Sequence, residues 1–473
     1  MNDQDRVFAI ILAAGQGTRM RSDRPKVLHR LCGRPMVDFV VEQARRAGAT
    51  DVVVVVGHGR DQVTAHLGEA FDGAVRTVVQ EPQRGTGDAA RHGMDAVDGA
   101  AGTVLLLYGD TPLIRAADLR RLLAARRDED RDLALLTCTL ADPTGYGRIV
   151  RDESGRIRAI AEHRDATPAE LAIREVNPGV YVGTARFLRS ALDQLSSDNA
   201  QGELYLTDVV AMAAEAGLIA SVPADAATLA GVNDRAQLAH AEAVLYERIA
   251  DRWRRDGVTV RAGARIDATV ELAPEAVIEH GVVLRGATRV GAGATIDVGS
   301  VLTDVEVAGG ALVKPYTVAA EAIIGPQAQT GPFAHLRPAA QLEEGARVGN
   351  FVEVKKTRLG PGAKASHLAY LGDGDVGAGA NIGAGTIFCN YDGYQKHRTV
   401  IGPGAFVGSD TQMVAPVTIG ARAYVATGSC VTRDVPDDAL AIARCRQENK
   451  EGYAARLRRR LAAAKEKAAE GKS

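Results

Sequence analysis

The stretch from residue 401 to residue 431, IGPGAFVGSDTQMVAPVTIGARAYVATGSCV, decides the fold of the C-terminal half of the chain. Its aliphatic residues recur every six positions, at Ile401, Val407, Met413, Ile419, Val425 and Val431. The same period returns in shorter runs, at Val376, Ile382 and Phe388 and at Val290, Ile296 and Leu302. A helix cannot sustain a period of six. A six-residue repeat with small turn residues is typical of a parallel β-helix, so we predict that fold here.

The amino-acid composition agrees with a narrow coil. Of the 51 glycines, 27 lie between residues 257 and 435, and aromatic residues make up only 4% of the chain. Each turn of such a coil has three faces, and one small aliphatic side chain per face points inward. We therefore expect aromatic side chains not to fit inside it. Because the ends and edges of a solenoid need cover, we also expect the protein to oligomerise.

The N-terminal half alternates predicted strands with predicted helices. The helices are expected from Pro35 to near Gly48 and over 86–98 and 116–127. This alternation predicts an open parallel sheet that binds ligands at the carboxyl ends of its strands. The strands are expected at Val7–Ala14, Val52–Val56, Val75–Val79, Val104–Leu107 and Leu133–Leu140.

A helical pattern over Asn233–Asp256, which Asp234 can cap, predicts a connector between two domains. We expect a first domain at 1–233, a linker helix at 234–256, a β-helix at 257–439 and a basic tail at 440–473. Residues 444–473 carry ten Lys or Arg and four Glu, and we expect a helix near 450–468. A solvated tail is the favoured interpretation of this charge, and a nucleic-acid contact is the second.

Charge, hydropathy and cysteine content exclude several classes of protein. The net charge is −2, which argues against a nucleic-acid binder, and the longest apolar run has eight residues, which is too short for a membrane helix. The opening MNDQDR lacks the layout of a signal peptide. The five cysteines form no C-x-x-C motif, so we expect free and mostly buried thiols in a cytoplasmic protein.

A glycine-rich loop, LAAGQGTRM, directly follows the first predicted strand at residues 12–20. Glycines let backbone N–H groups approach a phosphate, and Arg19 and Lys26 can neutralise phosphate oxygens. Met20 stands where a dinucleotide fingerprint needs its third glycine, and no Gly-Lys-Ser/Thr follows. The loop is therefore either a phosphate site of another kind or simply a tight strand-to-helix connection.

This loop, followed by Pro25-Lys26, resembles the sugar-nucleotide nucleotidyltransferase (pyrophosphorylase) family. Further motifs follow in the family's order: Gln80, Gly85-Thr86-Gly87, Tyr108-Gly109-Asp110, Thr144-Gly145-Tyr146-Gly147-Arg148, Glu162, Asn177 and Gly231-Val232-Asn233. Together with the hexapeptide half, residues 6–450 resemble the bifunctional N-acetylglucosamine-1-phosphate uridyltransferase/glucosamine-1-phosphate acetyltransferase family. The resemblance implies a Rossmann-like α/β domain followed by a left-handed β-helix.

The resemblance also implies roles for the N-terminal motif residues. Arg19 and Lys26 would bind the triphosphate of UTP and stabilise the departing pyrophosphate, and Asp110 and Asn233 would hold Mg²⁺. The sugar N-acetylglucosamine 1-phosphate would be fixed by Gly147, Glu162 and Asn177, although Pro178 after Asn177 departs from the family pattern. The nucleotide-binding set comprises Leu12, Ala13, Ala14, Gly15, Lys26, Gln80, Gly85, Thr86, Tyr108, Gly109 and Asp110.

The hexapeptide half contains a histidine, His367, where the repeat is least regular, with Arg337, Lys355 and Lys356 nearby in the sequence. A single histidine is more often structural than catalytic, but this one lies near groups that can bind phosphate, and histidine can take a proton near neutral pH. The motifs around it, GNFVE at 349–353, HLAYLGD at 367–373 and CNYDG at 389–393, resemble the acetyltransferase half of the same family.

By that resemblance, His367 is the general base for acetyl transfer from acetyl-CoA to glucosamine 1-phosphate. Arg337, Lys355, Tyr370 and Asn381 would bind the amino-sugar phosphate. Acetyl-CoA would be met by Ala384, Asn390, Tyr391, Ser409, Thr427 and Arg444, where Thr427 replaces the family's usual Ala. The loop at 390–400 would reach a neighbouring subunit in a homotrimer.

Three functions remain open at this point. The first is a two-site enzyme that supplies UDP-N-acetylglucosamine for peptidoglycan and other cell-wall glycans, lipid A included. The second is a nucleotidyltransferase whose β-helix only mediates trimerisation, and His367 with Asn390-Tyr391 argues against it. The third is a pure scaffold, which leaves Arg19, Lys26, Asp110 and Asn233 unexplained.

Overall fold

The apolar run at the start of the chain forms β1 (Val7–Ala13), a central strand of a ten-stranded sheet. The computed structural model describes residues 6–97 and 101–470. Successive β1 residues face opposite sides of the sheet. Ala9, Ile11 and Ala13 pack into one buried cluster, and Phe8, Ile10 and Leu12 pack into another. Two apolar faces require cover on both sides, and helices supply it.

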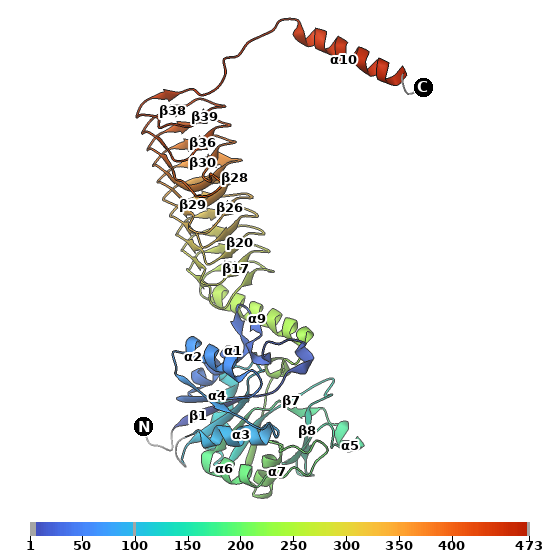
Figure 1. Ribbon diagram of the computed structural model, residues 1–473. Coiled ribbons are helices and arrows are strands. Elements are labelled where there is room, and N and C mark those ends of the chain that lie inside the picture. Colours follow the sequence, from blue (N-terminus) through green and yellow to red (C-terminus); the bar gives the residue numbers. More distant parts are fainter. Residues whose placement is uncertain (1–5, 98–100, 471–473) are drawn as a thin grey trace. The chain divides into compact units, whose positions relative to one another are not determined.

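The sheet has the order β5-β4-β1-β6-β11-β7-β10-β8-β9, and β12 pairs with β7. Helices α1, α2 and α4 contribute to the first buried cluster, and α3, α6 and α7 to the second (Figure 1). The strands are β4 (Asp51–Val56), β5 (Val75–Val79), β6 (Thr103–Tyr108), β7 (Leu133–Thr139), β8 (Gly147–Arg151), β9 (Ile157–Ala161), β10 (Glu175–Asn177), β11 (Tyr181–Thr184) and β12 (Ile219–Pro223). The helices are α1 (Met36–Ala47), α2 (Arg60–Ala70), α3 (Thr86–Asp95), α4 (Ala116–Asp128), α5 (Pro168–Leu171), α6 (Ala185–Asp193), α7 (Asp208–Glu215), α8 (Ala226–Leu229) and α9 (Arg235–Arg255).

The prediction of a purely parallel sheet is wrong at β10 and β11. Both strands run antiparallel to β7, and β11 separates β6 from β7. The cause is local connectivity. The chain leaves β7 at Thr139, forms the antiparallel pair β8–β9, and returns at Glu175 directly opposite Thr139. A strand that returns at the end it left must run the other way. The α/β class with helices on both faces is unaffected.

The predicted helix boundaries differ by a few residues from those observed. Gly48, at φ 114°, ends α1, and the side chain of Asp234 caps α9 by accepting a hydrogen bond from the Gln237 amide. The prediction of a helix to residue 98 was too long, because α3 ends at Asp95; residue 98 itself lies outside the described residues. No helix in the described part of the chain is both long and apolar enough to cross a membrane.

The hexapeptide half forms a parallel β-helix. Over much of its length, every third strand pairs in parallel with the next strand of the same column, as β16 does with β19 and β19 with β22 (Figure 1). At β28, β30 and β32 the partners are two strands apart. The short strands of this half therefore lie on successive turns of one coil, a left-handed parallel β-helix. One column contains β13 (Thr259–Val260), β16 (Val277–Ile278), β19 (Thr295–Ile296), β22 (Leu312–Val313), β25 (Gln329–Thr330), β28 (Arg347–Asn350), β30 (Lys364–His367), β32 (Asn381–Ile382), β35 (Phe406–Val407), β38 (Tyr424–Val425) and β40 (Leu440–Ala441).

The other two faces of the coil join into one set of seventeen strands. They are β14 (Arg265–Ile266), β15 (Glu271–Leu272), β17 (Val283–Arg285), β18 (Arg289–Val290), β20 (Val301–Thr303), β21 (Glu306–Val307), β23 (Val318–Ala320), β24 (Ile323–Ile324), β26 (His335–Leu336), β27 (Gln341–Leu342), β29 (Glu353–Leu359), β31 (Tyr370–Val376), β33 (Ile387–Cys389), β34 (Thr399–Ile401), β36 (Gln412–Val414), β37 (Val417–Ile419) and β39 (Cys430–Val431).

The hexad positions face the interior of the coil as predicted. Ile401, Val407, Met413, Ile419 and Val425 are each at most 1% exposed. The expectation that no aromatic ring fits inside is wrong, because Phe388 is completely buried. The ring fits because the residue facing it is Gly374, where an added Cβ would lie only 2.7 Å from Cε2 of Phe388.

Other aromatic residues lie on the outside of the coil. Tyr316, Phe333 and Phe351 stack on successive turns with ring centroids 5.3 and 5.5 Å apart, and each is about half exposed.

The expectation that the cysteine thiols are mostly buried is wrong. Cys32 and Cys138 are buried, but Cys430 and Cys445 are exposed. Cys430 precedes the inward-facing Val431 in β39, so strand alternation turns it outward.

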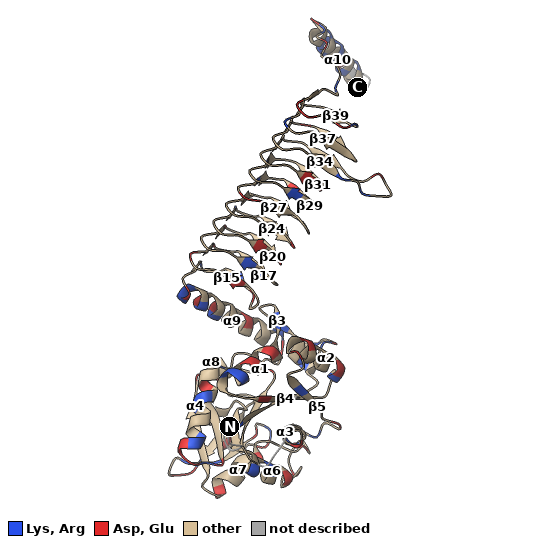
Figure 2. Ribbon diagram, turned by 90° about the vertical axis from the view of Figure 1, so that its left-hand side faces the viewer, with Lys and Arg blue, Asp and Glu red and all other residues tan. Residues whose placement is uncertain are grey.

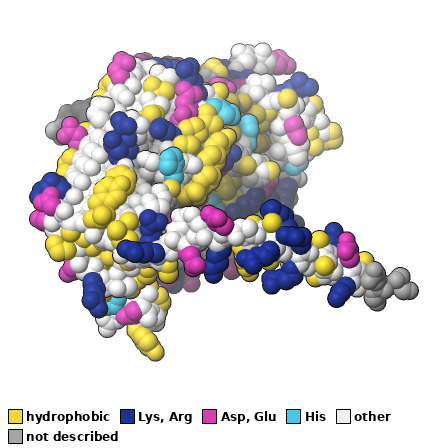
Figure 3. All heavy atoms as spheres, turned by 90° about the horizontal axis from the view of Figure 1, so that it is seen from above, with side chains coloured by type: hydrophobic (Ala, Val, Ile, Leu, Met, Phe, Trp, Pro, Cys, Tyr) yellow, Lys and Arg dark blue, Asp and Glu magenta, His cyan; other side chains and the backbone are white. Residues whose placement is uncertain are grey.

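The chain divides into two compact units. The first contains Met1–Val260, Ala264–Glu271 and Leu284–Ala287, and therefore includes α9; the second contains Arg261–Gly263, Leu272–Val283 and Thr288–Ser473. Residues of the tail form α10 (Tyr453–Glu470). In Figure 3, Lys and Arg side chains run along this helix.

Candidate active sites

A cavity of about 590 Å³ opens where β1 and β6 end, at the carboxyl edge of the sheet. Most of the predicted nucleotide residues line it. The lining includes Leu12, Ala13, Ala14, Gly15, Arg19, Lys26, Gln80, Gly85, Thr86, Tyr108, Asp110 and Asn233. Gly109, Gly147, Glu162 and Asn177 do not line it.

The glycine-rich loop brings two cationic side chains to the cavity. Gly17, at φ 63°, precedes a short 3-10 helix (Thr18–Met20) that carries Arg19. A Cβ at Gly17 would lie 2.7 Å from Cβ of Lys26, so a larger residue would displace Lys26. The loop is therefore more than a tight connection, because its glycine allows the lysine to pack against it.

Lys26 lies at the centre of a polar cluster. Its Nζ is 2.5 Å from Oδ2 of Asp110 and 2.7 Å from Oδ1 of Asn233, and Arg19 donates to the same Asn233 oxygen at 3.1 Å. The Val232 amide donates to the Asp110 carbonyl, which links the two segments that carry these oxygens. Two cationic side chains thus contact two side-chain oxygens that come from distant parts of the chain.

The two oxygens also fit a divalent cation. Mg²⁺ takes few oxygen ligands from protein and completes its shell with phosphate and water. Asp110 and Asn233 offer one carboxylate and one amide oxygen, and Lys26 now compensates the carboxylate. No group of three or more His, Cys, Asp or Glu with metal-site geometry occurs within residues 6–97 and 101–470.

Gln80 is buried beside the cavity, and its orientation is fixed by its amide nitrogen. That nitrogen donates to the Gly85 carbonyl at 3.0 Å and to the Asp88 carboxylate at 2.9 Å. The side-chain oxygen of Gln80 is therefore the group left to accept a hydrogen bond from a nucleobase.

Sequence reasoning missed Gln83, which lines the cavity and donates to the Ala14 carbonyl at 2.6 Å. The signal available was its position between Gln80 and Gly85.

The three predicted sugar residues lie together, away from the cavity lining. Gly147 and Asn177 are partners in the β8–β10 pair, and a Cβ at Gly147 would lie 3.6 Å from the Glu162 carboxylate. Asn177 donates to the Tyr181 hydroxyl at 2.6 Å and accepts from the Gly179 amide. Asn177 ends β10 in extended backbone, as expected for a residue before proline.

Glu162 is a mostly buried carboxyl group with acidic neighbours. Burial raises its pKa, and Asp208 and Asp165 add to the shift, while a hydrogen bond from Thr207 at 3.0 Å opposes it. No Lys or Arg forms an ion pair with Glu162 in the part of the chain that the structure describes. The ionised carboxylate therefore lowers the stability of the folded protein, and such destabilising charges are typical of binding sites.

We expect Glu162→Gln to stabilise the fold at pH 7 and to weaken sugar binding. A raised folded-state pKa means that the folded protein binds this proton more tightly than the unfolded chain, so the destabilisation grows as pH rises through the folded pKa. The variant's higher melting temperature at pH 7 should shrink towards that of the parent as pH falls to the pKa range of an ordinary carboxyl. The KM for N-acetylglucosamine 1-phosphate should rise about tenfold, as for a lost charged hydrogen bond. Equal melting temperatures at pH 7 would contradict the assignment.

A second cluster of cationic side chains lies on the β-helix. Lys355 in β29 is 3.6 Å from the Asp373 carboxylate in β31, and Arg337 donates to Glu353 at 2.7 Å. Tyr370 pairs with Glu353 across the same two strands. The loop between β33 and β34 stands out from the coil beside β34 (Figure 2) and contributes Lys396.

Lys396 was missed by sequence reasoning. Hydrogen bonding with Lys355 of β29 and repulsion from its charge lower the pKa of Lys396, in line with a position of the loop lysine close to Lys355. A bound phosphate would relieve this repulsion. The available signal was a lysine inside the one insertion that interrupts the hexads.

His367 ends β30 and is exposed, with its Nδ1 2.8 Å from Oδ1 of Asn350. An amide oxygen can only accept, so Nδ1 carries the hydrogen and Nε2 keeps a free lone pair. Asn350 is a third residue whose role the sequence did not reveal. His367 lines a cavity of about 270 Å³ with Arg347, Lys314 and Gln329. Tyr370 begins β31 three residues later, so the two lie on either side of one corner of the coil.

The predicted acetyl-CoA residues follow one corner over successive turns. The Asp410 amide donates to the Ala384 carbonyl, and the Gly428 amide donates to the Ser409 carbonyl. A Cβ at Gly408 would lie 2.5 Å from the Thr427 nitrogen, and one at Gly428 would lie 3.8 Å from Cδ of Arg444. Asn390, by contrast, is buried at the base of the loop, donating to Asp373 at 2.5 Å; Tyr391 in the same loop is 60% exposed. Asn381 begins β32, next to Lys364 of the preceding turn.

We expect Gly349→Ala to impair acetyl transfer at least tenfold. The added Cβ would overlap the Ser366 carbonyl oxygen, so the two turns must separate. Gly349 precedes Asn350, and Ser366 precedes His367, so the shift would disturb the hydrogen bond between them. Overpacking of this kind costs about 1–3 kcal/mol, so the melting temperature of the β-helix should also fall. Unchanged acetyl transfer would show that the contact between the turns does not position His367.

Residues 9–207 match the family model described as the MobA-like NTP transferase domain. A bifunctional protein GlmU from Sorangium cellulosum is 65% identical over 458 residues, covering 96% of this chain and 97% of that protein. Bifunctional GlmU proteins from Trichlorobacter lovleyi (49% identical) and an Anaeromyxobacter species (52% identical) each match 95% of this chain and cover 98% and 92% of their own lengths.

The similarity extends through both the α/β unit and the β-helix, at identities far above those that indicate a shared fold alone. This chain therefore belongs to the GlmU family of bifunctional proteins.

Proposed function

We propose that the chain makes UDP-N-acetylglucosamine in two steps at two separate sites. The β-helix transfers an acetyl group from acetyl-CoA to glucosamine 1-phosphate, and the α/β unit then joins the product to UTP. The observation that carries this proposal is the convergence of Arg19, Lys26, Asp110 and Asn233 in one cavity. The bifunctional relatives favour two activities over a nucleotidyltransferase with an inert β-helix.

In uridylyl transfer, a phosphate oxygen of the sugar phosphate attacks the α-phosphorus of UTP. The new P–O bond forms as the bond to the β-phosphate oxygen breaks, and pyrophosphate leaves. Transfer of this kind depends on positioning and charge neutralisation. Arg19 and Lys26 supply positive charge where negative charge develops, and Gln80 orients the base. Glu162 and Asn177 orient the sugar.

The family and its nucleotidyltransferase domain indicate a divalent metal cofactor, and we propose Mg²⁺ held by Asp110 and Asn233. A bound divalent ion supplies charge neutralisation for phosphate oxygens. Asp110 and Asn233 would then release Lys26, whose ammonium group becomes available to the triphosphate.

In acetyl transfer, the amine of glucosamine 1-phosphate attacks the thioester carbon of acetyl-CoA. His367 accepts the amine proton at Nε2, while Asn350 holds the ring by accepting from Nδ1. The C–N bond forms, the C–S bond breaks, and the proton is passed to the thiolate of CoA. The amino-sugar phosphate is held by Arg337, Lys355, Tyr370 and Asn381. Acetyl-CoA is held by Ala384, Asn390, Tyr391, Ser409, Thr427 and Arg444.

We propose that the protein is a homotrimer in the cytoplasm, acting on small molecules and not on nucleic acid or a membrane. The position of His367 around a corner from Tyr370 supports assembly, because a loop such as 390–400 from another copy could complete the site. The free thiols support a reducing compartment. We place the domains at 1–233, 234–256, 257–439 and 440–473.

The test is a reaction with purified full-length protein. UTP, Mg²⁺, acetyl-CoA and glucosamine 1-phosphate together should yield UDP-N-acetylglucosamine, pyrophosphate and free CoA. Thiol release from acetyl-CoA measured without UTP separates the two-site enzyme from a single-activity nucleotidyltransferase. Absence of thiol release would overturn the acetyltransferase half of the proposal.

A further inference from the structure

A second pocket of about 400 Å³ lies within the first compact unit, outside the nucleotide cavity. Its walls are α1, the loop at 112–115 and α9. Five arginines line it, from three separate segments, together with a single acidic residue, Glu42. The arginines are Arg34, Arg46, Arg115, Arg248 and Arg252. So many guanidinium groups around one carboxylate leave the pocket with an excess of positive charge.

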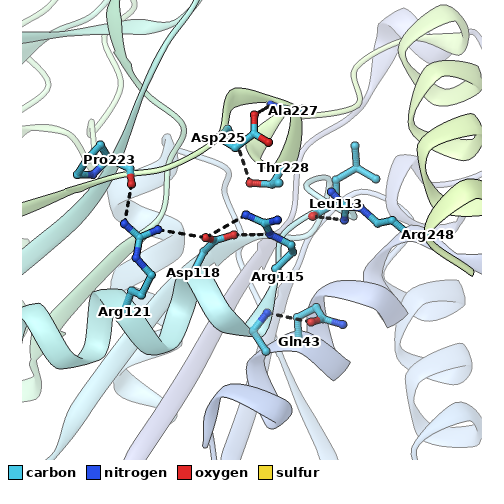
Figure 4. Close-up of polar contacts among 11 residues, drawn as sticks. Gln43, Leu113, Arg115, Asp118, Arg121, Pro223, Asp225, Ala227, Thr228 and Arg248 are labelled. Atoms are coloured by element: carbon cyan, nitrogen blue, oxygen red, sulfur yellow. Dashed lines mark hydrogen bonds and ion pairs between the residues drawn. The ribbon is translucent and has the colours of Figure 1, made fainter. Parts of the chain in front are cut away.

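Three of these arginines already have acidic partners. Arg34 lies 2.5 Å from Glu42 and 3.7 Å from Asp38, and Arg46 lies 3.9 Å from Glu42. Arg115 holds the buried Asp118 through two nitrogens, at 2.9 and 3.3 Å (Figure 4). The charge of these groups is compensated, so they shape the pocket without being free to bind an anion.

Arg248 has no acidic partner of this kind. Its Nη1 donates to the Leu113 carbonyl at 2.7 Å (Figure 4). No carboxylate pairs with Arg248 among residues 6–97 and 101–470. Burial lowers the pKa of Arg248, and the nearby Arg115 lowers it further, while Asp118 and Asp225 offset this only in part. A half-buried guanidinium held against another cation is stabilised by any anion that joins it.

Arg252 lies one helical turn further along α9, so it faces the same side as Arg248. It is exposed, and within the described residues its side chain contacts only the ring of Trp253, whose centroid lies 4.5 Å from its Cζ. Two guanidinium groups therefore remain uncompensated at one end of the pocket. A dianion matches them, and a phosphate monoester carries about −1.5 to −2 at neutral pH.

The floor of the pocket is apolar. Phe39, Ile114, Leu245 and Ile249 line it, and each is at most 8% exposed. A bare inorganic ion makes no use of such a floor, whereas an organic body attached to the phosphate would pack on it. The volume falls within the range of about 300–1,000 Å³ that is typical of small-molecule sites, and the lining offers both charged and apolar side chains to one ligand.

We propose that this pocket binds a small organic phosphate, with the phosphate on Arg248 and Arg252 and the organic body on the apolar floor. The site is separate from the nucleotide cavity, but residues of its wall lie close in sequence to residues of that cavity. Pro112, in its wall, follows Asp110 by two residues, and α9 begins two residues after Asn233. A ligand in this pocket would therefore contact the two segments that carry Asp110 and Asn233 in the nucleotide cavity.

The experiment uses Trp253, the single tryptophan of the chain, as a reporter beside Arg252. Full-length protein is titrated with phenyl phosphate, inorganic phosphate and benzoate while tryptophan emission is recorded. We expect saturable changes with phenyl phosphate, weaker binding of inorganic phosphate and of benzoate, and an affinity for phenyl phosphate at least about tenfold lower in Arg248→Gln. Arg126→Gln is the matched control, because Arg126 is also partly buried, has a pKa lowered by burial and donates to a backbone carbonyl.

Lys26→Gln separates this proposal from the proposed function. It should abolish uridylyl transfer but leave the tryptophan titration unchanged. Arg248→Gln should instead weaken the tryptophan response to phenyl phosphate and leave uridylyl transfer, measured without phenyl phosphate, unchanged. If Arg248→Gln fails to fold, Arg252→Gln, at an exposed position, tests the same site by calorimetry. No saturable change in the parent, an unchanged affinity in both arginine variants, or equal binding of inorganic phosphate and phenyl phosphate would overturn the proposal.

Discussion

Replacing His367 by alanine is expected to lower the rate of acetyl transfer by about 10²- to 10⁴-fold, the usual contribution of a general base. Uridylyl transfer in the same preparation should not change. The physical reason is the arrangement of the imidazole. Its Nδ1 is committed to Oδ1 of Asn350 at 2.8 Å, so Nε2 is the one nitrogen that can accept the amine proton.

The measurement is the initial rate of thiol release from acetyl-CoA with saturating glucosamine 1-phosphate. His280→Ala is the matched control, because His280 is also an exposed histidine whose Nδ1 lies 2.7 Å from an oxygen, the Ala262 carbonyl. Asn350→Ala should retain the base but lose its orientation, so kcat should fall less than in His367→Ala while KM stays near that of the parent. If His367→Ala keeps its rate within about threefold, another group is the base.

The second large effect is expected at Asp110. Asp110→Asn should lower uridylyl transfer by at least about 10²-fold, the scale found when a preorganised electrostatic group is removed from an active site. Acetyl transfer should continue at the parent rate. Asp110 supplies a carboxylate that pairs with Lys26, and the asparagine can neither compensate the ammonium group nor hold a divalent ion as strongly.

The readout is pyrophosphate release as a function of Mg²⁺ concentration. The Mg²⁺ concentration for half-maximal rate should rise in Asp110→Asn, and a chelator should stop uridylyl transfer in the parent without affecting thiol release. Asp128→Asn, at an exposed carboxylate of α4 paired with Arg127, is the control. An unchanged Mg²⁺ dependence would remove Asp110 from the metal site and leave it only a structural partner of Lys26.

Periodic local patterns predicted most of the fold. The hexads identified the β-helix because each aliphatic residue faces the interior once per strand, a relation that needs only neighbouring residues. The helix from Met36 to Ala47 was predicted equally well, because Pro35 and Gly48 act at its ends. Most of the residues that the resemblance named for the nucleotide line one cavity, and their binding roles stay predictions.

The direction of β10 and β11 could not be predicted this way, because it depends on where the chain returns to β7. The interior position of Phe388 depends on Gly374, fourteen residues earlier but facing it on the adjacent turn. The predicted roles of Gly147, Glu162 and Asn177 came from resemblance, and nothing local in the sequence placed them outside the cavity lining.

The sequence by itself determined the class of each half, the order of the motifs and the residue types that carry the chemistry, because these follow from spacing along the chain. Only the tertiary structure decided which groups meet. Lys26, Asp110 and Asn233 are separated by 84 and 123 residues, yet one ammonium group contacts both oxygens. The Asn350 contact that sets the tautomer of His367, and the five arginines gathered in one pocket, likewise arise from the folding of distant segments onto one another. Such contacts depend on how strands and helices pack in space, and spacing along the chain does not encode that packing.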